Sequence, residues 1–153
     1  MIYSCTYHSP LGPMLLSATD EALIALEFGT SASDDHTLIL ASAIAELDEY
    51  YRGLRTEFTV PLQMHGTAFQ MAVWNALLTI PYGQTRSYGQ IAAQIGNPKA
   101  SRAVGMANNR NPISIIVPCH RVIGSDGSLV GYGGGLDKKV WLLDFEAAHT
   151  AQR

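Results

Sequence analysis

The sequence predicts a mixed α/β (α+β) protein in two parts: a small N-terminal antiparallel sheet with a helix over residues 1–62, and a mostly helical part with a helix-turn-helix over residues 63–153. In the first part, short runs of strand-forming residues alternate with Gly, Pro and Asp turns. In the second part, helical periodicity and capping signals predominate. With 153 residues and 47% hydrophobic content, the chain is long enough to bury a core.

Three strands are expected in the first part, at residues 2–7, 14–18 and 22–28, with turns at residues 9–13 and near Asp20. Residues 37–51 place apolar side chains at helical spacing, and Gly53 ends that helix. Residues 55–60 predict one more strand, and residues 61–66 a linker.

The second part opens with Thr67 and Gln70 at capping-box spacing, followed by a helix that stops at Pro81-Tyr82-Gly83. Ser87 opens another helix, residues 96–98 break it, and residues 99–109 form the next. This order predicts a helix-turn-helix at about residues 87–109.

Beyond the Asn111-Pro112 turn, the apolar residues 113–117 predict a buried strand that leads into Cys119. A glycine-rich loop follows at residues 124–135, and residues 136–148 predict a closing helix. Because the loop lacks the spacing and helix context of a phosphate-binding loop, we expect no nucleotide cofactor.

Charge is distributed unevenly along the chain. The net formal charge is −3 overall, but −7 over residues 1–57, +5 over residues 58–125 and −1 over the rest; residues 58–125 contain no Asp or Glu. A long segment that carries only positive charge favours a surface that meets phosphate. Chance combined with burial is the alternative.

The pentapeptide Pro118-Cys119-His120-Arg121-Val122 carries the candidate nucleophile. Thiolate is the reactive form of cysteine, and the neighbouring His120 and Arg121 are suited to favour it. The alternative is a packed cysteine at a corner of the fold, since free cysteines are often buried. Cys5, the other cysteine, is interpreted as structural.

Small residues dominate the helix over residues 100–107, which carries Arg102 as its one charged side chain. It lacks the side chains that distinguish bases in a major groove, and instead fits a narrow groove with Arg102 free to enter the base stack. An ordinary helix-packing face is the alternative.

No signal-peptide pattern opens the sequence, and no apolar run approaches the roughly 18 residues of a membrane span. We therefore expect a cytoplasmic protein that does not act at a membrane. A reducing compartment would keep the thiol of Cys119 available.

Several motifs together resemble the O6-alkylguanine-DNA alkyltransferases (methylated-DNA–protein-cysteine methyltransferases), suicide repair proteins that move an alkyl group from guanine onto a cysteine. The similarity runs from about Gly66 to Glu146, and Ser9-Pro10-Leu11-Gly12 adds a weaker signal. The motifs are Gly66-Thr67-Ala68-Phe69-Gln70, Val73-Trp74, Ile80-Pro81-Tyr82-Gly83, Ser87-Tyr88, Arg102-Ala103-Val104-Gly105, Asn111-Pro112, the Cys119 pentapeptide and Gly131-Tyr132-Gly133-Gly134-Gly135.

The resemblance implies a ribonuclease H-like fold for the N-terminal part and a role for each matched residue. Cys119 would accept the alkyl group, His120 would link it through water to Glu146, Asn111 would hold the turn that shapes the pocket, and Tyr88 would donate its hydroxyl to the departing guanine. The implied DNA-binding residues are Arg102, Ala103, Gly105, Ser87, Tyr88, Arg110 and Arg121, with Arg102 replacing the flipped nucleotide. The implied substrate pocket comprises Val122, Tyr132, Gly133, Gly134 and Lys139, of which Lys139 would support the tyrosine.

Two departures from the family pattern bear on these expectations. Some relatives bind a structural zinc through two cysteines and two histidines, but Cys5 has no second cysteine nearby, so we expect no metal and no cofactor. Position 133 is glycine where some relatives have serine, which leaves only its backbone N–H for the guanine oxygen.

The function implied is single-turnover repair of O6-alkylguanine, and also of O4-alkylthymine, in double-stranded DNA that a monomer binds through the minor groove. Two alternatives remain. A lesion-binding relative that signals damage would carry another residue in place of Cys119. A cysteine hydrolase would use Cys119, His120 and Glu146 on an acyl substrate, and would turn over.

Overall fold

The computed structural model describes residues 1–150, and the chain divides into two compact units, Met1–Met64 (unit 1) and His65–Arg153 (unit 2). Unit 1 holds a small antiparallel sheet with a helix, and unit 2 is mostly helical. The predicted mixed α/β fold is confirmed.

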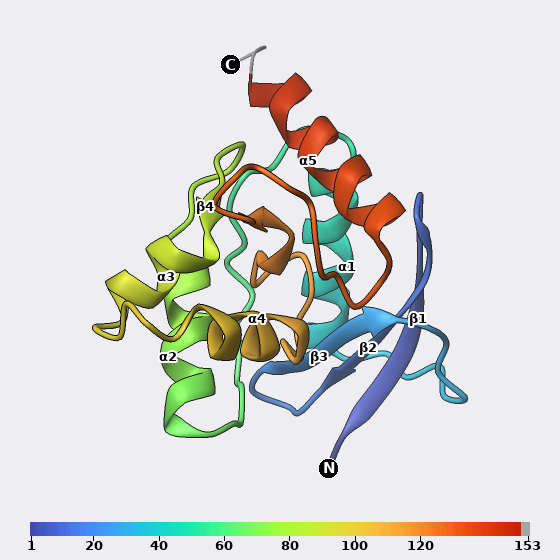
Figure 1. Ribbon diagram of the computed structural model, residues 1–153. Helices are drawn as coiled ribbons and strands as arrows, with labels where there is room; N and C mark the ends of the chain where they lie inside the picture. The colour runs from blue at the N-terminus through green and yellow to red at the C-terminus, as the bar shows by residue number, and fades with distance from the viewer. Residues whose placement is uncertain (151–153) are drawn as a thin grey trace. The chain divides into compact units, whose positions relative to one another are not determined.

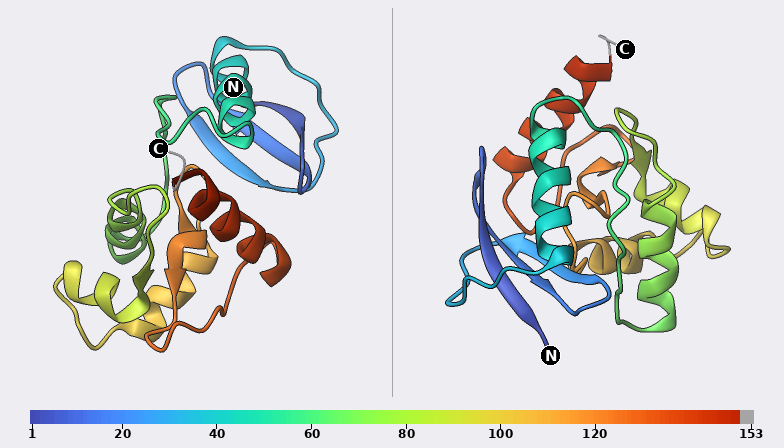
Figure 2. Two further views of the ribbon diagram at one scale, coloured as in Figure 1. Left: turned by 90° about the horizontal axis from the view of Figure 1, so that it is seen from above. Right: turned by 180° about the vertical axis from the view of Figure 1, so that it is seen from behind.

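Unit 1 is a three-stranded meander covered by one helix (Figure 1). Strands β1 (Tyr3–Ser9), β2 (Gly12–Ala18) and β3 (Leu23–Phe28) pair antiparallel in sequence order. Helix α1 (Leu38–Tyr51) packs along one face of the sheet (Figure 2). Thr37 caps α1 by accepting a hydrogen bond from the backbone N–H of Leu40, as its polar side chain before an apolar run predicts.

Residues 55–60 do not form the strand that the sequence predicts. Their backbone groups bind a side chain instead: the buried Glu46 carboxylate accepts hydrogen bonds from the N–H groups of Thr59 and Val60 and from the Thr59 hydroxyl. The one sheet-like contact lies just beyond, where Leu62 forms an isolated parallel bridge with Leu23. A carboxylate from α1 thus satisfies donors that a neighbouring strand would otherwise satisfy.

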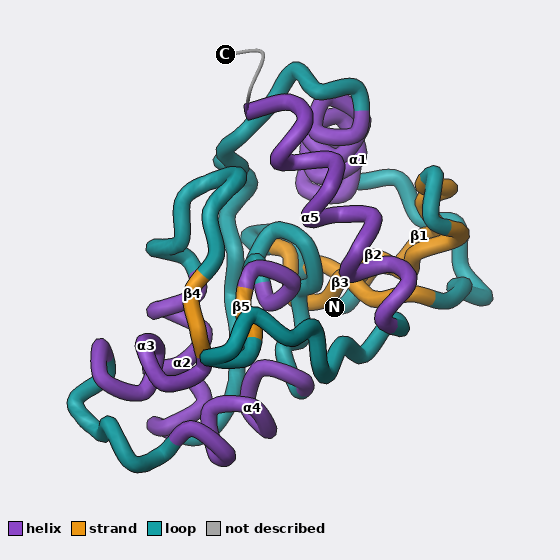
Figure 3. Tube along the Cα trace, turned by 45° about the horizontal axis from the view of Figure 1, so that its top comes forward, coloured by secondary structure: helices purple, strands orange, loops and turns teal. Residues whose placement is uncertain are grey.

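Over residues 65–150, unit 2 contains four α-helices and one short parallel strand pair (Figure 3). The helices are α2 (Ala68–Leu77), α3 (Tyr88–Gln94), α4 (Ser101–Asn109) and α5 (Leu136–Thr150). Strand β4 (Arg86–Ser87) pairs with β5 (Val122–Ile123), which follows a 3-10 turn, η1 (Cys119–Arg121).

Capping boxes fix the starts of two helices, as predicted. The side chains of Thr67 and Gln70 exchange hydrogen bonds with each other's backbone N–H at α2, and Ser87 and Gln90 do the same at α3. Helices α3 and α4 then pack together across a tight turn, in a helix-turn-helix arrangement. The indole N–H of Trp74 on α2 donates to the Ala107 carbonyl, at 2.8 Å, and so holds the end of α4.

Residues 113–117 are a buried run of turns, and the predicted strand is absent. Ile115 adopts a φ of 70°, an uncommon region for a β-branched residue, and the Ile116 N–H donates to the Ser114 carbonyl across it. The apolar side chains that suggested a strand are buried nonetheless, since Ile113, Ile115 and Val117 are each at most 1% exposed. Burial was predicted correctly and backbone conformation was not.

Among residues 1–150, no helix has the length and apolar character needed to cross a membrane.

Candidate active site

Cys119 lies at the first position of η1 and is 5% exposed. Its backbone N–H donates to the Val117 carbonyl at 2.8 Å, across Pro118. This tight turn delivers the cysteine directly from the buried segment 113–117 into the 3-10 turn. The local sequence therefore fixes where the sulfur sits.

The resting thiol of Cys119 is protonated rather than ionised at neutral pH. Burial raises its pKa, and the opposing influences of hydrogen bonding from Asn111 and of the positive charge on Lys139 are smaller. The expectation that His120 and Arg121 would stabilise a thiolate is not supported, because Arg121 is committed to another partner. The site needs a base to take the thiol proton when substrate arrives.

His120, the next residue in the chain, is the candidate for that base. Its Nε2 lies 2.7 Å from Oε2 of Glu146, and both side chains are at most 1% exposed. Burial lowers the pKa of His120, whereas its hydrogen-bonding and charged neighbours hold the pKa of the Glu146 carboxyl well below its usual range despite burial. A neutral imidazole beside a carboxylate places its proton on Nε2.

The other ring nitrogen, Nδ1, is buried and has no hydrogen-bond partner among the described residues. With the proton on Nε2, this atom is the acceptor. His120 and Glu146 are in direct contact, so the water of the predicted relay belongs between Cys119 and His120. A relay is needed only between Nδ1 and the sulfur of Cys119.

The Arg121 side chain is buried, so the prediction that Arg121 contacts DNA is corrected. The residue is 6% exposed. Its Nε and Nη2 donate to Oε1 and Oε2 of Glu146 at 2.8 and 3.0 Å, and its Nη1 donates to the Ile80 carbonyl at 2.7 Å. A buried arginine is almost always paired, so the apolar residues on both sides of this one were the signal that could have revealed it.

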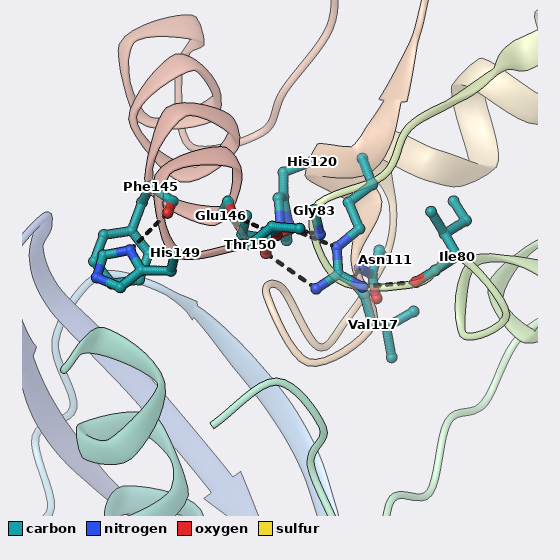
Figure 4. Close-up of polar contacts among 10 residues, drawn as sticks. Ile80, Gly83, Asn111, Val117, His120, Phe145, Glu146, His149 and Thr150 are labelled. Carbon is teal, nitrogen blue, oxygen red and sulfur yellow. Dashed lines mark hydrogen bonds and ion pairs between the residues drawn. The ribbon is translucent and has the colours of Figure 1, made fainter. Parts of the chain in front are cut away.

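Figure 4 shows that two other segments reach Glu146: η1 through His120, and the turn after α2 through Gly83. The Gly83 N–H, in the turn after α2, donates to Oε1 of Glu146 at 3.2 Å. Gly83 has a φ of 77°, and a side chain there would collide with Thr150. Glycine is therefore required for this turn to reach the carboxylate.

Two asparagines, Asn108 in α4 and Asn111 just after it, bind the backbone of the segment that leads to Cys119. Asn111 donates from Nδ2 to the Val117 carbonyl at 2.7 Å and accepts from the Ile113 N–H at 3.0 Å. Asn108, which sequence reasoning missed, is 1% exposed and donates to the Cys119 carbonyl at 3.3 Å. Its position on the buried face of α4 was its only sequence signal.

Tyr88 and Lys139 meet at the Val130 carbonyl. The Tyr88 hydroxyl donates to it at 2.9 Å, as does the fully buried Lys139 ammonium, which also donates to the Val122 carbonyl at 2.6 Å. Burial raises the pKa of Tyr88 and lowers that of Lys139. Lys139 thus holds the glycine-rich loop beside the tyrosine, at 5.9 Å from the ring centre.

A cleft of about 610 Å³ opens beside Tyr88 and α4. Arg102 and Gly105 line it, together with Asp126 and Ser128 of the glycine-rich loop, which were not predicted. Ala103 and Arg110 are exposed on α4 or just after it but do not line the cleft, and Ser87 caps α3. Of the predicted pocket residues, Val122 is fully buried in β5, Tyr132 and Gly134 are half-buried, and Gly133 is exposed.

Two family models cover most of the chain. The model described as the 6-O-methylguanine DNA methyltransferase DNA binding domain matches residues 68–148, and the model described as the ribonuclease-like domain of the same methyltransferase matches residues 2–64. The chain belongs to the 6-O-methylguanine DNA methyltransferase family.

Relatives within this family match along almost their whole length. The chain is 50% identical to a methylated-DNA–protein-cysteine methyltransferase of Mycobacterium leprae, over 95% of this chain and 93% of the relative, and 48% identical to one of Methanosarcina acetivorans, over 96% and 99%. A crystal structure of Mycobacterium tuberculosis OGT in complex with DNA has a TM-score of 0.90 and 49% identity, over 96% of this chain and 94% of that one.

For this family member, the geometry supplies a buried thiol, a neutral imidazole base and a carboxylate that orients it. Among residues 1–150, no group of three or more His, Cys, Asp or Glu side chains could hold a metal ion. The chemistry that the arrangement supports is nucleophilic attack by sulfur after loss of its proton to His120.

The pKa shifts of His120 and Glu146 predict that acid destabilises unit 2. Both pKa values are lower in the folded state, so the folded protein binds fewer protons and stability falls as pH falls. The loss should begin below about 6.5, where the unfolded histidine titrates, and steepen below about 4.3, where the unfolded glutamate does. Urea denaturation of the parent and of Glu146→Gln from pH 8 to pH 4 measures this. A parent whose stability does not change over that range contradicts the assignment.

Proposed function

We propose that this protein repairs DNA by transferring the alkyl group of O6-alkylguanine, and of O4-alkylthymine, to Cys119 in one irreversible step per molecule. The observation that carries the proposal is a buried cysteine followed directly by a buried histidine whose Nε2 lies 2.7 Å from the Glu146 carboxylate. Membership of the 6-O-methylguanine DNA methyltransferase family supports the same reaction.

In the proposed reaction, the sulfur of Cys119 attacks the alkyl carbon in line with the bond to O6. The thiol proton passes to Nδ1 of His120, and Glu146 stabilises the imidazolium. The carbon–sulfur bond forms as the carbon–O6 bond breaks, and the electron pair stays on the guanine. Tyr88 exchanges its hydrogen bond with the Val130 carbonyl for one to the departing base, which assists its release.

The product is a thioether, which neither cellular reductants nor water readily cleave. Each molecule therefore acts once. Turnover would instead favour the alternative of a cysteine hydrolase, for which the Cys119, His120 and Glu146 set would also serve. A family member that only signals damage would not carry a cysteine at position 119.

The DNA is proposed to lie against α4, with the lesion flipped out of the duplex. Arg102 and Ala103 are exposed, and a side chain at Gly105 would lie within 3.8 Å of the Tyr88 ring. Helix α4 therefore presents a surface of small residues with one positive charge. Such a face fits the minor groove of double-stranded DNA, where Arg102 fills the gap in the stack. Ser87 and Arg110 would contact phosphates. The protein would act as a cytoplasmic monomer.

The alkylated base is proposed to enter beside the glycine-rich loop, against Val122, Tyr132, Gly133 and Gly134. Gly133 has open space around it, since the nearest atom to an added side chain would be the Asn109 carbonyl oxygen at 3.8 Å. Its backbone N–H is the donor available to the guanine oxygen. Lys139 keeps the loop in place through the Val130 carbonyl.

Replacing the nucleophile should separate binding from chemistry. Cys119→Ser should bind methylated duplex as the parent does but transfer no methyl group, because a hydroxyl is barely ionised at neutral pH and is a far weaker nucleophile. Cys5→Ser is the matched control and should transfer at the parental rate. Peptide mapping by mass spectrometry locates the methyl group. Equal single-turnover rates for Cys119→Ser and the parent would refute the assignment.

Removing the charge on α4 should affect duplex repair selectively. Arg102→Ala should slow transfer from O6-methylguanine in duplex DNA far more than transfer from free O6-benzylguanine, because only the duplex substrate must be unstacked, at a cost of a few kcal/mol. Arg86→Ala, which removes a cation before α3, serves as a comparison. Equal losses on both substrates would place Arg102 in the pocket or in the fold.

A further inference from the structure

Among the residues that the structure describes, four hydrogen-bond donors bind the buried carboxylate of Glu146. Two come from the Arg121 guanidinium, at 2.8 and 3.0 Å, one from the Gly83 N–H at 3.2 Å, and the fourth from Nε2 of His120 at 2.7 Å. The proposed reaction uses only His120 and Glu146 of this group. Arg121 therefore donates two of these four hydrogen bonds, but it has no assigned part in the chemistry.

A structural ion pair alone is a poor explanation for this arrangement. Removing two charges from water costs several kcal/mol per ion, and a buried pair often contributes little net stability compared with apolar residues of the same volume. A histidine would also orient on a carboxylate that had no arginine. What Arg121 changes is the electrostatic state of the carboxylate that His120 meets.

We propose that Arg121 is a positioning residue of the proton relay: its guanidinium binds both carboxylate oxygens of Glu146, fixes the carboxylate opposite Nε2 of His120, and keeps His120 neutral, with Nδ1 free to accept the Cys119 proton. This inference rests on the proposed transfer to Cys119. It gives the arginine of the pentapeptide a role in chemistry rather than in DNA binding.

The charges around His120 explain how the arginine acts. Glu146 from α5 favours the imidazolium, whereas Arg121 from η1 and Lys139 from α5 oppose it, and burial opposes it most of all. Cys119, whose thiol can also titrate, directly precedes His120 in the sequence. With Arg121 in place, the carboxylate attracts the Nε2 proton but is too weak a base to stabilise a resting imidazolium. The base is then unprotonated before substrate binds.

Geometry favours arginine over lysine at this position. The planar fork donates to both oxygens of Glu146, and a third donor, Nη1, reaches the Ile80 carbonyl at 2.7 Å. The guanidinium carbon also lies 5.6 Å from the centre of the Tyr82 ring. An ammonium group could supply the charge but not the three fixed directions.

The test is the titration of His120 in the free protein, monitored through the NMR signals of its ring nitrogens. The parent, Arg121→Met and Arg121→Lys are compared. Loss of the positive charge in Arg121→Met should raise the pKa of His120 by about 1, as removal of a nearby like charge does. Arg121→Lys retains the charge and should titrate near the parent. Unchanged titration in Arg121→Met would overturn the proposal.

Single-turnover transfer from free O6-benzylguanine gives a second readout that DNA binding does not affect. In Arg121→Met the acid limb of the rate should move to higher pH by the same amount as the His120 titration, with half-saturating substrate concentration unchanged. In Arg121→Lys the limb should stay in place while the rate falls at every pH, because the fork is lost. A uniform loss in Arg121→Met with no shift would indicate a purely structural role and contradict the proposal.

A matched control comes from unit 1, where Arg55 binds Glu49 through Nε and Nη2 at 3.1 and 2.9 Å. Arg55→Met should change neither the His120 titration nor the pH profile. If Arg121→Met does not fold, Arg121→Lys decides: a shifted acid limb would overturn the proposal. If the parent titrates as expected but transfers no alkyl group, the proposed function fails and the role of Arg121 in setting the state of His120 stands.

Discussion

The carboxylate of Glu146 is the interaction on which the site depends. It joins three segments of unit 2 that are distant in sequence: the turn at residues 80–83, η1 at residues 119–121 and helix α5. Because an unpaired buried charge costs several kcal/mol, each segment is held by the need to satisfy this one group. The orientation of the His120 ring toward Glu146 follows from that requirement.

The same network explains why the nucleophile can be both buried and reactive. Burial keeps the thiol protonated and shields it from solvent. The base that must remove the proton is held neutral, with its accepting nitrogen unpartnered among the described residues. In the proposed reaction, proton transfer from the thiol to His120 then waits for a substrate. On the other side of Cys119, Asn108 of α4 donates to the Cys119 carbonyl, and Asn111, just after α4, donates to the Val117 carbonyl.

Local sequence signals predicted most of the helical framework, because caps and helical periodicity act within a few residues. The capping boxes at Thr67 and Ser87 begin α2 and α3 where expected, and Gly53 follows the end of α1. The failures depend on distant partners. Residues 55–60 have a strand-like sequence, but the Glu46 carboxylate binds backbone N–H groups there that a neighbouring strand would otherwise bind. Ile115 adopts a positive φ that no β-branched residue favours in isolation. Strands β4 and β5 are two residues each, too short for any pattern.

Motif resemblance proposed Cys119, His120 and Glu146 as site residues, but it did not predict their contacts. The structure brings His120 and Glu146 together. The resemblance could not show that the Arg121 side chain is buried, since an arginine in a positively charged segment is equally consistent with a phosphate contact. Asn108 had only a weak signal, its position on the buried face of α4, because a single asparagine in a helix has no periodicity of its own.

Intact mass spectrometry with excess O6-methylguanine duplex is the direct test of the proposed stoichiometric transfer to Cys119. Each chain should gain the mass of one methyl group in place of one hydrogen, the gain should lie on Cys119, and repair should stop when every chain is modified. Continued repair by unmodified protein, or a methyl group on another residue, would contradict it.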